Sequence, residues 1–222
     1  QAMDFLTQQT KVLFGKEVKN QIMATDKDVI VIGGGDTGSD CIGTSNRHGA
    51  KSVVNFEIMP KPPGHRSAST PWPFWPLKLK TSSSHKEGVE RSWLINTKEF
   101  IKDKEGKLIA LKTINVQWEV IPGKRPELIE IAGTEKTWPC DLALLALGFT
   151  GPESTLADKL GIDKDERSNY KAIYGKYQTN IPNIFTAGDM RRGQSLIVWA
   201  ISEGREAARQ VDNCLLRISQ VI

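Results

Sequence analysis

The chain has 222 residues, of which 39% are hydrophobic, and its 30 basic and 26 acidic residues give a net charge of +4. This length allows one complete hydrophobic core and part of a second, and so small a charge, with no dense basic run, argues against nucleic-acid binding. The longest apolar run, residues 142–149, is too short to span a membrane and the N-terminus lacks the apolar core of a signal peptide, so we expect a cytoplasmic protein without a membrane anchor.

The first 25 residues are predicted to form a short helical lead-in. They include the apolar residues Phe5, Leu6, Val12 and Leu13 and contain no glycine-rich nucleotide loop. A buried strand is predicted at residues 29–32, a helix at 40–47 and a second strand at 52–59. This order predicts an α/β fold with a Rossmann-like dinucleotide-binding domain built on a parallel sheet.

A glycine loop, residues 33–38, joins the first predicted strand to the helix. Gly33 can make the tight turn, Gly35 lets the backbone approach a pyrophosphate, and Gly38 lets helix and strand pack closely. The anion would then lie at the helix N-terminus, where free N–H groups and the helix dipole favour negative charge. The alternative is a glycine turn that binds nothing.

Glu57 lies near the end of the second predicted strand, where a ribose-binding acid is expected. A carboxylate there accepts hydrogen bonds from the adenosine 2′-OH and repels a 2′-phosphate, which favours NADH over NADPH. Lys61, His65 and Arg66 follow closely and could neutralise a phosphate if their loop folds back. The alternative for Glu57 is a solvated acid at a strand end.

Residues 60–86 are rich in proline and serine but also carry large aromatic residues: Trp72, Phe74 and Trp75. A solvated linker would not hold so many large apolar side chains, so we expect this segment to pack onto something. One hypothesis is a loop that covers its own domain. The other is a lid over the nicotinamide or a surface for partner docking.

From residue 89 the pattern changes to strands separated by polar turns. Strands are predicted at 92–101, 108–120 and 127–132, with a turn at 122–126, as an antiparallel meander. Residues 141–148 return to a continuous apolar run that ends in Gly148, which is typical of a buried parallel strand. The domain is therefore predicted to close near Gly148.

The last informative block begins at residue 181. A short strand is predicted to deliver Gly188 and Asp189 at its C-terminal end, and from Ala200 onward apolar residues recur near helical spacing. Asp189 is either a ligand-contacting acid or an ordinary turn acid near a helix.

Nothing in the sequence predicts a metal site or a catalytic side chain. Cys41, Cys140 and Cys214 lie far apart without a Cys-x-x-Cys pair, and the three histidines share no metal-ligand spacing. A short-chain dehydrogenase would need Tyr-x-x-x-Lys, which the tyrosines near residue 170 do not provide.

These motifs resemble those of the glutamate synthase small (β) subunits and their relatives, flavoproteins with two dinucleotide-binding domains. The resemblance rests on residues 33–38 with Asp40 and Cys41, on residues 55–60 with 71–76, and on residues 187–196. It implies that NADH or NADPH binds the glycine loop and that Asp189 contacts the ribityl-phosphate region of FAD. The residues it assigns to cofactors are Gly33, Gly34, Gly35, Asp36, Thr37, Gly38, Glu57, Gly148, Gly188, Asp189, Gln194, Ser195 and Leu196.

The family's cysteine-rich iron–sulfur region and first FAD glycine loop have no counterpart here. The resemblance therefore implies a C-terminal part of a longer polypeptide: residues 1–25 lead in from an FAD domain, 26–149 bind NAD(P)H, and 150–222 form the C-terminal segment of the FAD domain. It implies hydride transfer from NAD(P)H to FAD, iron–sulfur clusters outside this chain, and a large-subunit partner that forms glutamate from glutamine and 2-oxoglutarate. Alternatives are a related flavoprotein reductase with another acceptor, and a non-catalytic module for nucleotide binding or partner docking.

Overall fold

The computed structural model describes residues 1–71, 77–121, 123 and 126–219, with side chains as far as residue 216. The chain divides into two compact units, residues 1–148 and 149–222. The hypothesis of an aromatic lid or docking surface depends on Trp72, Phe74 and Trp75, which lie outside the described residues. Most of the turn predicted at 122–126 also lies outside them.

The first unit is built on a parallel sheet with the strand order β3-β2-β1-β8. Its strands are β1 (Asp28–Ile32), β2 (Ser52–Glu57), β3 (Glu90–Trp93) and β8 (Leu142–Leu145). All three neighbouring pairs in it are parallel. The predicted α/β fold with a parallel sheet is therefore confirmed, and β2 ends two residues before the predicted strand end.

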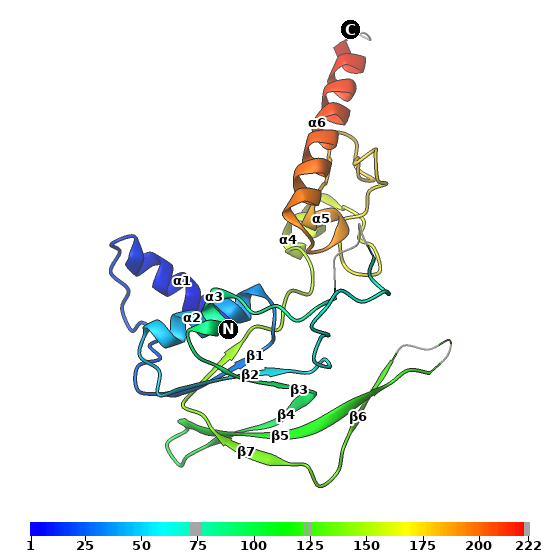
Figure 1. Ribbon diagram of the computed structural model, residues 1–222. Helices are drawn as coiled ribbons and strands as arrows, with labels where there is room; N and C mark the ends of the chain where they lie inside the picture. The colour runs from blue at the N-terminus through cyan, green and yellow to red at the C-terminus, as the bar shows by residue number, and fades with distance from the viewer. Residues whose placement is uncertain (72–76, 122, 124–125, 220–222) are drawn as a thin grey trace. The chain divides into compact units, whose positions relative to one another are not determined.

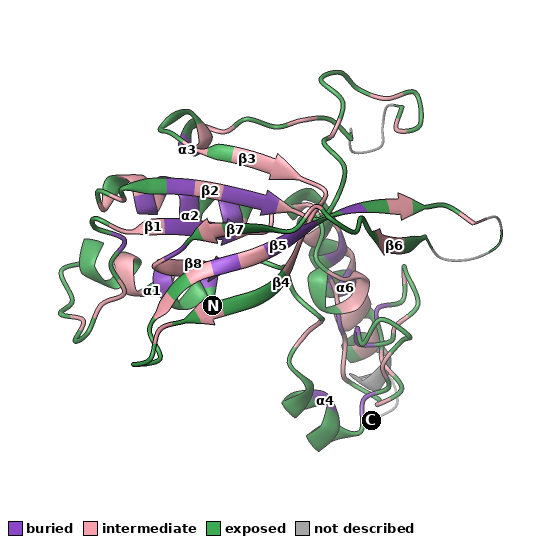
Figure 2. Ribbon diagram, turned by 90° about the horizontal axis from the view of Figure 1, so that it is seen from below, coloured by how far each residue is buried: buried purple, intermediate pink, exposed green. Residues whose placement is uncertain are grey.

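Both faces of this sheet are covered, which explains why β1 is apolar at consecutive positions. Val29 and Val31 pack toward the helices α1 (Ala2–Leu13) and α2 (Asp36–Arg47), in a cluster that includes Phe5 and Ile42. Ile30 packs on the opposite face. The short helix α3 (Ser83–Lys86) lies on the same face as α1 and α2 (Figure 1). Figure 2 shows buried residues along β1, β2 and β5 and on α2.

The opposite face of the parallel sheet is covered by an antiparallel sheet. Its strands are β4 (Ile95–Lys102), β5 (Leu108–Glu119), β6 (Glu127–Glu130) and β7 (Lys136–Pro139). β5 pairs with the other three strands, and Leu111 contributes to the core against Ile30 and Phe56. The antiparallel meander is confirmed, and β7 is an additional strand that the sequence did not predict.

One boundary in this region was predicted wrongly. The single strand predicted at 92–101 is divided at Leu94, whose φ of 58° lies in the left-handed region and breaks the extended backbone. The part before Leu94 is β3, which pairs in parallel with β2 instead of joining the meander. This division brings Arg91 of β3 opposite Asn55 of β2.

The predicted helix within the first 25 residues is present as α1, and it packs in the core of the first unit with residues of β1 and α2. Ala2 and Phe5 are buried in the same cluster as Val29 and Cys41. The origin of this lead-in in a flavin domain stays a prediction.

The second unit contains α4 (Ser154–Leu160), α5 (Asp189–Arg192) and α6 (Ile197–Ser219). Its small core is formed by Ala157, Ile162 and Tyr170. The Tyr170 hydroxyl donates to the carbonyl of Glu153 (2.8 Å) and accepts from the Ala157 N–H (3.1 Å), which ties the start of α4 to this core.

The strand predicted before Gly188 is not formed. Phe185 makes only an isolated bridge to Gln178, because the chain turns between Ile181 and Ile184. In this turn the Ile184 N–H donates to the Ile181 carbonyl (3.3 Å). In the described part of the chain, no helix is long and apolar enough to cross a membrane.

Candidate functional site

The glycine loop lies at the C-terminal end of β1, between β2 and β8, and leads directly into α2. Gly33 has a φ of +113°, and a Cβ there would lie 2.2 Å from the carbonyl oxygen of Ala146. A Cβ at Gly38 would lie 2.3 Å from the Gly33 carbonyl oxygen. Both positions require glycine, the first for the turn and the second because helix and loop backbones touch.

The N-terminus of α2 is open to a ligand. The helix begins at Asp36, four residues before the predicted start, and its N-cap is Gly35, which supplies no capping side chain. A Cβ built on Gly35 meets nothing within 4 Å, and Gly34, Gly35 and Asp36 are exposed. The first N–H groups of a helix, here those of Asp36, Thr37 and Gly38, have no partner within it. With the helix dipole they suit an anion, so this loop fits a dinucleotide pyrophosphate.

Asn55 holds the loop to the neighbouring strand, a contact that the sequence analysis missed. Its buried Nδ2 donates to the carbonyls of Val31 (3.1 Å) and Gly33 (3.0 Å). The Gly33 N–H donates in turn to the Phe56 carbonyl (2.8 Å). A polar residue within an otherwise apolar strand was the signal that could have identified this brace.

Glu57 reaches the glycine loop from the end of β2. A Cβ built on Gly34 would lie 2.0 Å from the carboxylate carbon of Glu57, so this carboxylate lies directly against the loop. Glu57 Oε1 also accepts a hydrogen bond from Arg91 Nη2 (3.1 Å), and the two side chains are only 15% and 13% exposed. The acid at this position was predicted from the sequence, but its basic partner Arg91 was not.

A cavity of about 160 Å³ adjoins the loop. Besides Gly34, Glu57 and Arg91, it is lined by Lys78, Lys80 and His85. Lys61, His65 and Arg66, the basic residues expected to approach the ribose, do not line it. Instead, Lys61 lies over the ring of Trp93, 5.0 Å from the centroid.

His85, which lines this cavity, is fixed by a capping box at the start of α3. The Ser82 N–H donates to His85 Nδ1 (3.2 Å), and the Ser82 hydroxyl accepts from the His85 N–H (3.3 Å). The Ser82 hydroxyl also lies 2.5 Å from that of Ser39 in α2. Burial, followed by the nearby Arg91 guanidinium, lowers the pKa of His85, so its imidazole is neutral at pH 7.

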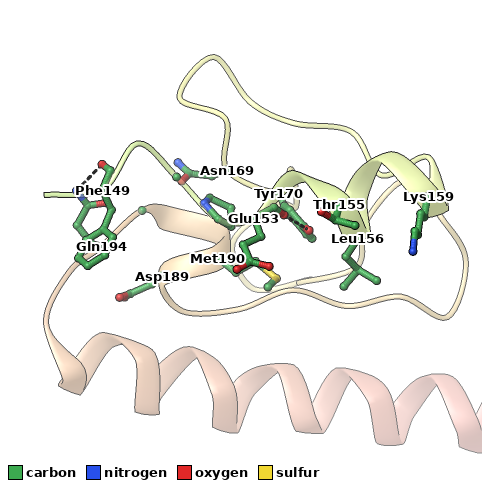
Figure 3. A pocket seen from close by; sticks show the side chains of 13 residues that line it. Phe149, Glu153, Thr155, Leu156, Lys159, Asn169, Tyr170, Asp189, Met190 and Gln194 are labelled. Carbon is green, nitrogen blue, oxygen red and sulfur yellow. Dashed lines mark hydrogen bonds between the residues drawn. The ribbon is translucent and has the colours of Figure 1, made fainter. Parts of the chain in front are cut away.

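In the second unit, a cavity of about 700 Å³ opens beside Asp189. The side chains labelled in Figure 3 come from α4 and its N-cap Glu153, from the loop that carries Asn169 and Tyr170, from the start of α5, and from Phe149 and Gln194. Gln194 also lines the cavity and donates to the carbonyl of Phe149 (3.3 Å). This volume lies within the range of small-molecule and cofactor sites.

The other residues of this region that the resemblance assigned to a cofactor, Gly188, Ser195 and Leu196, do not line this cavity. The Ser195 N–H donates to Asp189 Oδ1 (3.3 Å), and the Leu196 carbonyl accepts from the Trp199 N–H (2.9 Å) at the start of α6. Gly148 belongs to the first unit, where it follows β8 with a φ of +84°. The structure therefore brings Asp189, Gln194 and Ser195 together and leaves Gly148 in the other unit.

A buried acid of α6 holds the turn before Asp189, and the sequence analysis missed it. Glu203 is fully buried and accepts from the Gly188 N–H (3.0 Å) and from Arg191 Nε (2.8 Å) and Nη2 (2.6 Å). Arg192 Nε lies 3.0 Å from the same carboxylate. The hydrogen bond from Arg191 lowers the pKa of Glu203. A glutamate placed among apolar helix positions was the available signal.

Cys41 and Cys140 are buried, free thiols. Burial raises the pKa of Cys41 to about 12 and that of Cys140 to about 11, which keeps both thiols protonated at neutral pH. The described residues contain no group of three or more His, Cys, Asp or Glu side chains arranged to hold a metal ion.

Comparison with known proteins agrees with this geometry. The family model described as pyridine nucleotide-disulphide oxidoreductase matches residues 4–204. "Glutamate synthase [NADH]" of Schizosaccharomyces pombe is 46% identical over 95% of this chain, which covers 10% of that protein. The "Glutamate synthase [NADPH] small chain" proteins of Mycobacterium tuberculosis and Bacillus subtilis are 45% and 44% identical over 97% of this chain. The chain spans less than half the length of these small chains, 44% and 45%.

Solved structures support the fold. FprA of Mycobacterium tuberculosis in complex with NADPH matches 86% of this chain and 53% of its own, with a TM-score of 0.60 at 11% identity. The bacillithiol disulfide reductase of Bacillus cereus matches 85% of this chain and 50% of its own, with a TM-score of 0.54 at 18% identity.

Proposed function

The chain belongs to the pyridine nucleotide-disulphide oxidoreductase family, and from this membership we propose that it is the nicotinamide-binding and flavin-contacting part of a glutamate synthase small subunit or of the matching region of a single-chain glutamate synthase. The observation that carries the proposal is the uncapped N-terminus of α2 behind Gly35, which is open to a pyrophosphate. The identity of 44–46% to glutamate synthases over nearly the whole chain supports this enzyme among the members of the family.

The chemistry belongs to the cofactors: bound NAD(P)H supplies a hydride to FAD, whose electrons continue to an acceptor. The chain's own residues bind and orient them. Residues 33–38 hold the pyrophosphate of the nicotinamide dinucleotide. Asp189 would contact the ribityl-phosphate region of bound FAD, and Gln194, Ser195 and Leu196 would stabilise charge on its reduced ring. In this proposal no side-chain acid or base takes part, because positioning is the protein's contribution.

NADH is the proposed donor, since Glu57 lies against the loop where the adenosine ribose is expected. A carboxylate accepts hydrogen bonds from a 2′-OH and repels a 2′-phosphate. The names of the relatives include both nucleotides, so this preference rests on Glu57 alone.

The proposed electron path leaves this chain through iron–sulfur clusters carried elsewhere in the complete protein and ends in a large subunit or domain. There the acceptor is the adduct of 2-oxoglutarate with ammonia derived from glutamine, and the complex is cytoplasmic. Proteins named as glutamate synthase small chains imply such a partner.

The test is a reconstitution of the complete small subunit with its large partner. We expect NADH oxidation that requires both glutamine and 2-oxoglutarate, and anaerobic NADH should bleach the flavin absorbance. The Gly35→Val variant should lose both signals while its flavin content stays normal. Flavin bleaching without any dependence on glutamine and 2-oxoglutarate would instead identify a related reductase with another acceptor.

A further inference from the structure

The cavity beside the glycine loop contains more basic groups than an NADH site requires. Two acids, Asp36 and Glu57, share it with four basic residues: Arg91, Lys78, Lys80 and His85. An adenosine ribose that carries only hydroxyl groups needs the acid and no cation. The three cationic side chains, those of Arg91, Lys78 and Lys80, therefore call for an explanation.

Arg91 is held in place from several sides. Its Nη1 donates to the Lys80 carbonyl (2.9 Å), its Nη2 donates to Glu57, and its guanidinium lies 5.0 Å from the centroid of the Trp93 ring. The side chain is 13% exposed. A guanidinium fixed in this way loses little conformational freedom when it binds an anion, and its fork of donors matches a phosphate.

Two donors at this cavity lack an acceptor. Arg91 Nε is buried without a hydrogen-bond partner among the described residues, and the same is true of His85 Nε2. The Ser82 N–H donates to His85 Nδ1, so in the neutral imidazole the proton is on Nε2. Buried N–H groups without an acceptor are costly. Both nitrogens belong to residues that line the cavity, and a ligand oxygen would satisfy them once the surrounding side chains shift to admit it.

We propose that Arg91 is a specificity-determining residue for the nucleotide: it forms, with His85, a site for the adenosine 2′-phosphate of NADPH that the Glu57 carboxylate keeps neutralised. The inference deepens the proposed function and rests on it. Glu57 occupies Arg91 Nη2 and repels a phosphate, and this sets the preference for NADH. Loss of that one negative charge is then sufficient to admit NADPH, without any added basic residue.

The experiment is calorimetric titration of the chain with NADH and with NADPH, for the wild type and for Glu57→Gln, Arg91→Gln and the double variant. Glutamine keeps a side-chain oxygen that can accept from Arg91, so the pair stays hydrogen-bonded. We expect Glu57→Gln to raise the affinity for NADPH relative to NADH by about tenfold or more, or 1.4 kcal/mol per tenfold. The double variant should lose that gain. A thermal melt of each variant verifies that it is folded.

Lys61→Gln serves as the matched control, because Lys61 is a basic residue of the same region that does not line the cavity. In the Glu57→Gln background it should leave NADPH binding unchanged. The inference is overturned if Glu57→Gln does not shift the ratio of the two affinities, or if the double variant binds NADPH as tightly as Glu57→Gln. Binding of neither nucleotide to the wild type would overturn the proposed function, and this inference with it.

Discussion

Removal of the Glu203 carboxylate should open the turn that positions Asp189. Glu203 is fully buried and compensates Arg191, whose side chain is 12% exposed, while it also accepts from the Gly188 N–H. Glu203→Ala leaves a buried guanidinium and a backbone donor without an acceptor. Breaking a buried pair in this way costs about 3–5 kcal/mol. Glu203→Gln keeps the shape and one acceptor but loses the charge, which predicts a smaller loss of about 1.5–3 kcal/mol.

Hydrogen exchange is the suitable assay, because it reports the opening of the second unit separately from the first. We expect the free energy of opening at the Gly188 amide and along α6 to fall by these amounts. Asp158→Asn is the matched control, since Asp158 pairs with Lys164 at the surface of the same unit and its side chain is 66% exposed. Its effect should stay below about 1 kcal/mol. Equal protection of Gly188 in Glu203→Ala and Asp158→Asn would refute this account of the buried pair.

Three further predictions follow from the same geometry. Arg191 lowers the pKa of Glu203 below its ordinary value of 4.5, so the stabilisation by this pair is fully present above pH 4.5 and is lost as the pH falls through the lowered pKa. Acid titration of the opening free energy should show this loss, and the Glu203→Gln variant should not show it. Gly38→Ala places a Cβ 2.3 Å from a carbonyl oxygen and should cost about 3 kcal/mol in urea unfolding, whereas Gly35→Ala meets open space and should cost less than about 1 kcal/mol. The 222-residue chain purified by itself should carry no stoichiometric FAD, because its only Gly-x-Gly-x-x-Gly is assigned to the nicotinamide dinucleotide; an absorbance spectrum with one flavin per chain would reverse that assignment.

Local sequence was sufficient where hydrophobic pattern and glycine chemistry agreed. The apolar run before Gly33 predicted β1, and the run before Gly148 predicted β8, because strands buried on both faces are continuously apolar. The roles of Gly33 and Gly38 follow from the same local logic, since a turn and a close backbone contact tolerate no Cβ.

The contacts that the sequence did not predict depend on which strand lies beside which. Arg91 reaches Glu57 only because the extended backbone is interrupted at Leu94 and β3 joins the parallel sheet. Strand propensity alone cannot distinguish this arrangement from one longer strand of the meander. Glu203 meets Arg191 across a turn of the second unit. Both pairs are tertiary contacts. The sequence shows that a charged residue stands at an unusual position, but it does not show which residue will pair with it.

The central claim is that residues 33–38 bind the pyrophosphate of a nicotinamide dinucleotide. The most direct test is calorimetric titration of the chain with NADH and NADPH, in parallel with Gly35→Val and with Gly64→Val, a control at another glycine whose Cβ would meet open space. We predict that the wild type and Gly64→Val bind NADH and that Gly35→Val does not. Failure of the wild type to bind either nucleotide at millimolar concentration, or unchanged binding by Gly35→Val, would contradict the claim and leave the loop as a turn only.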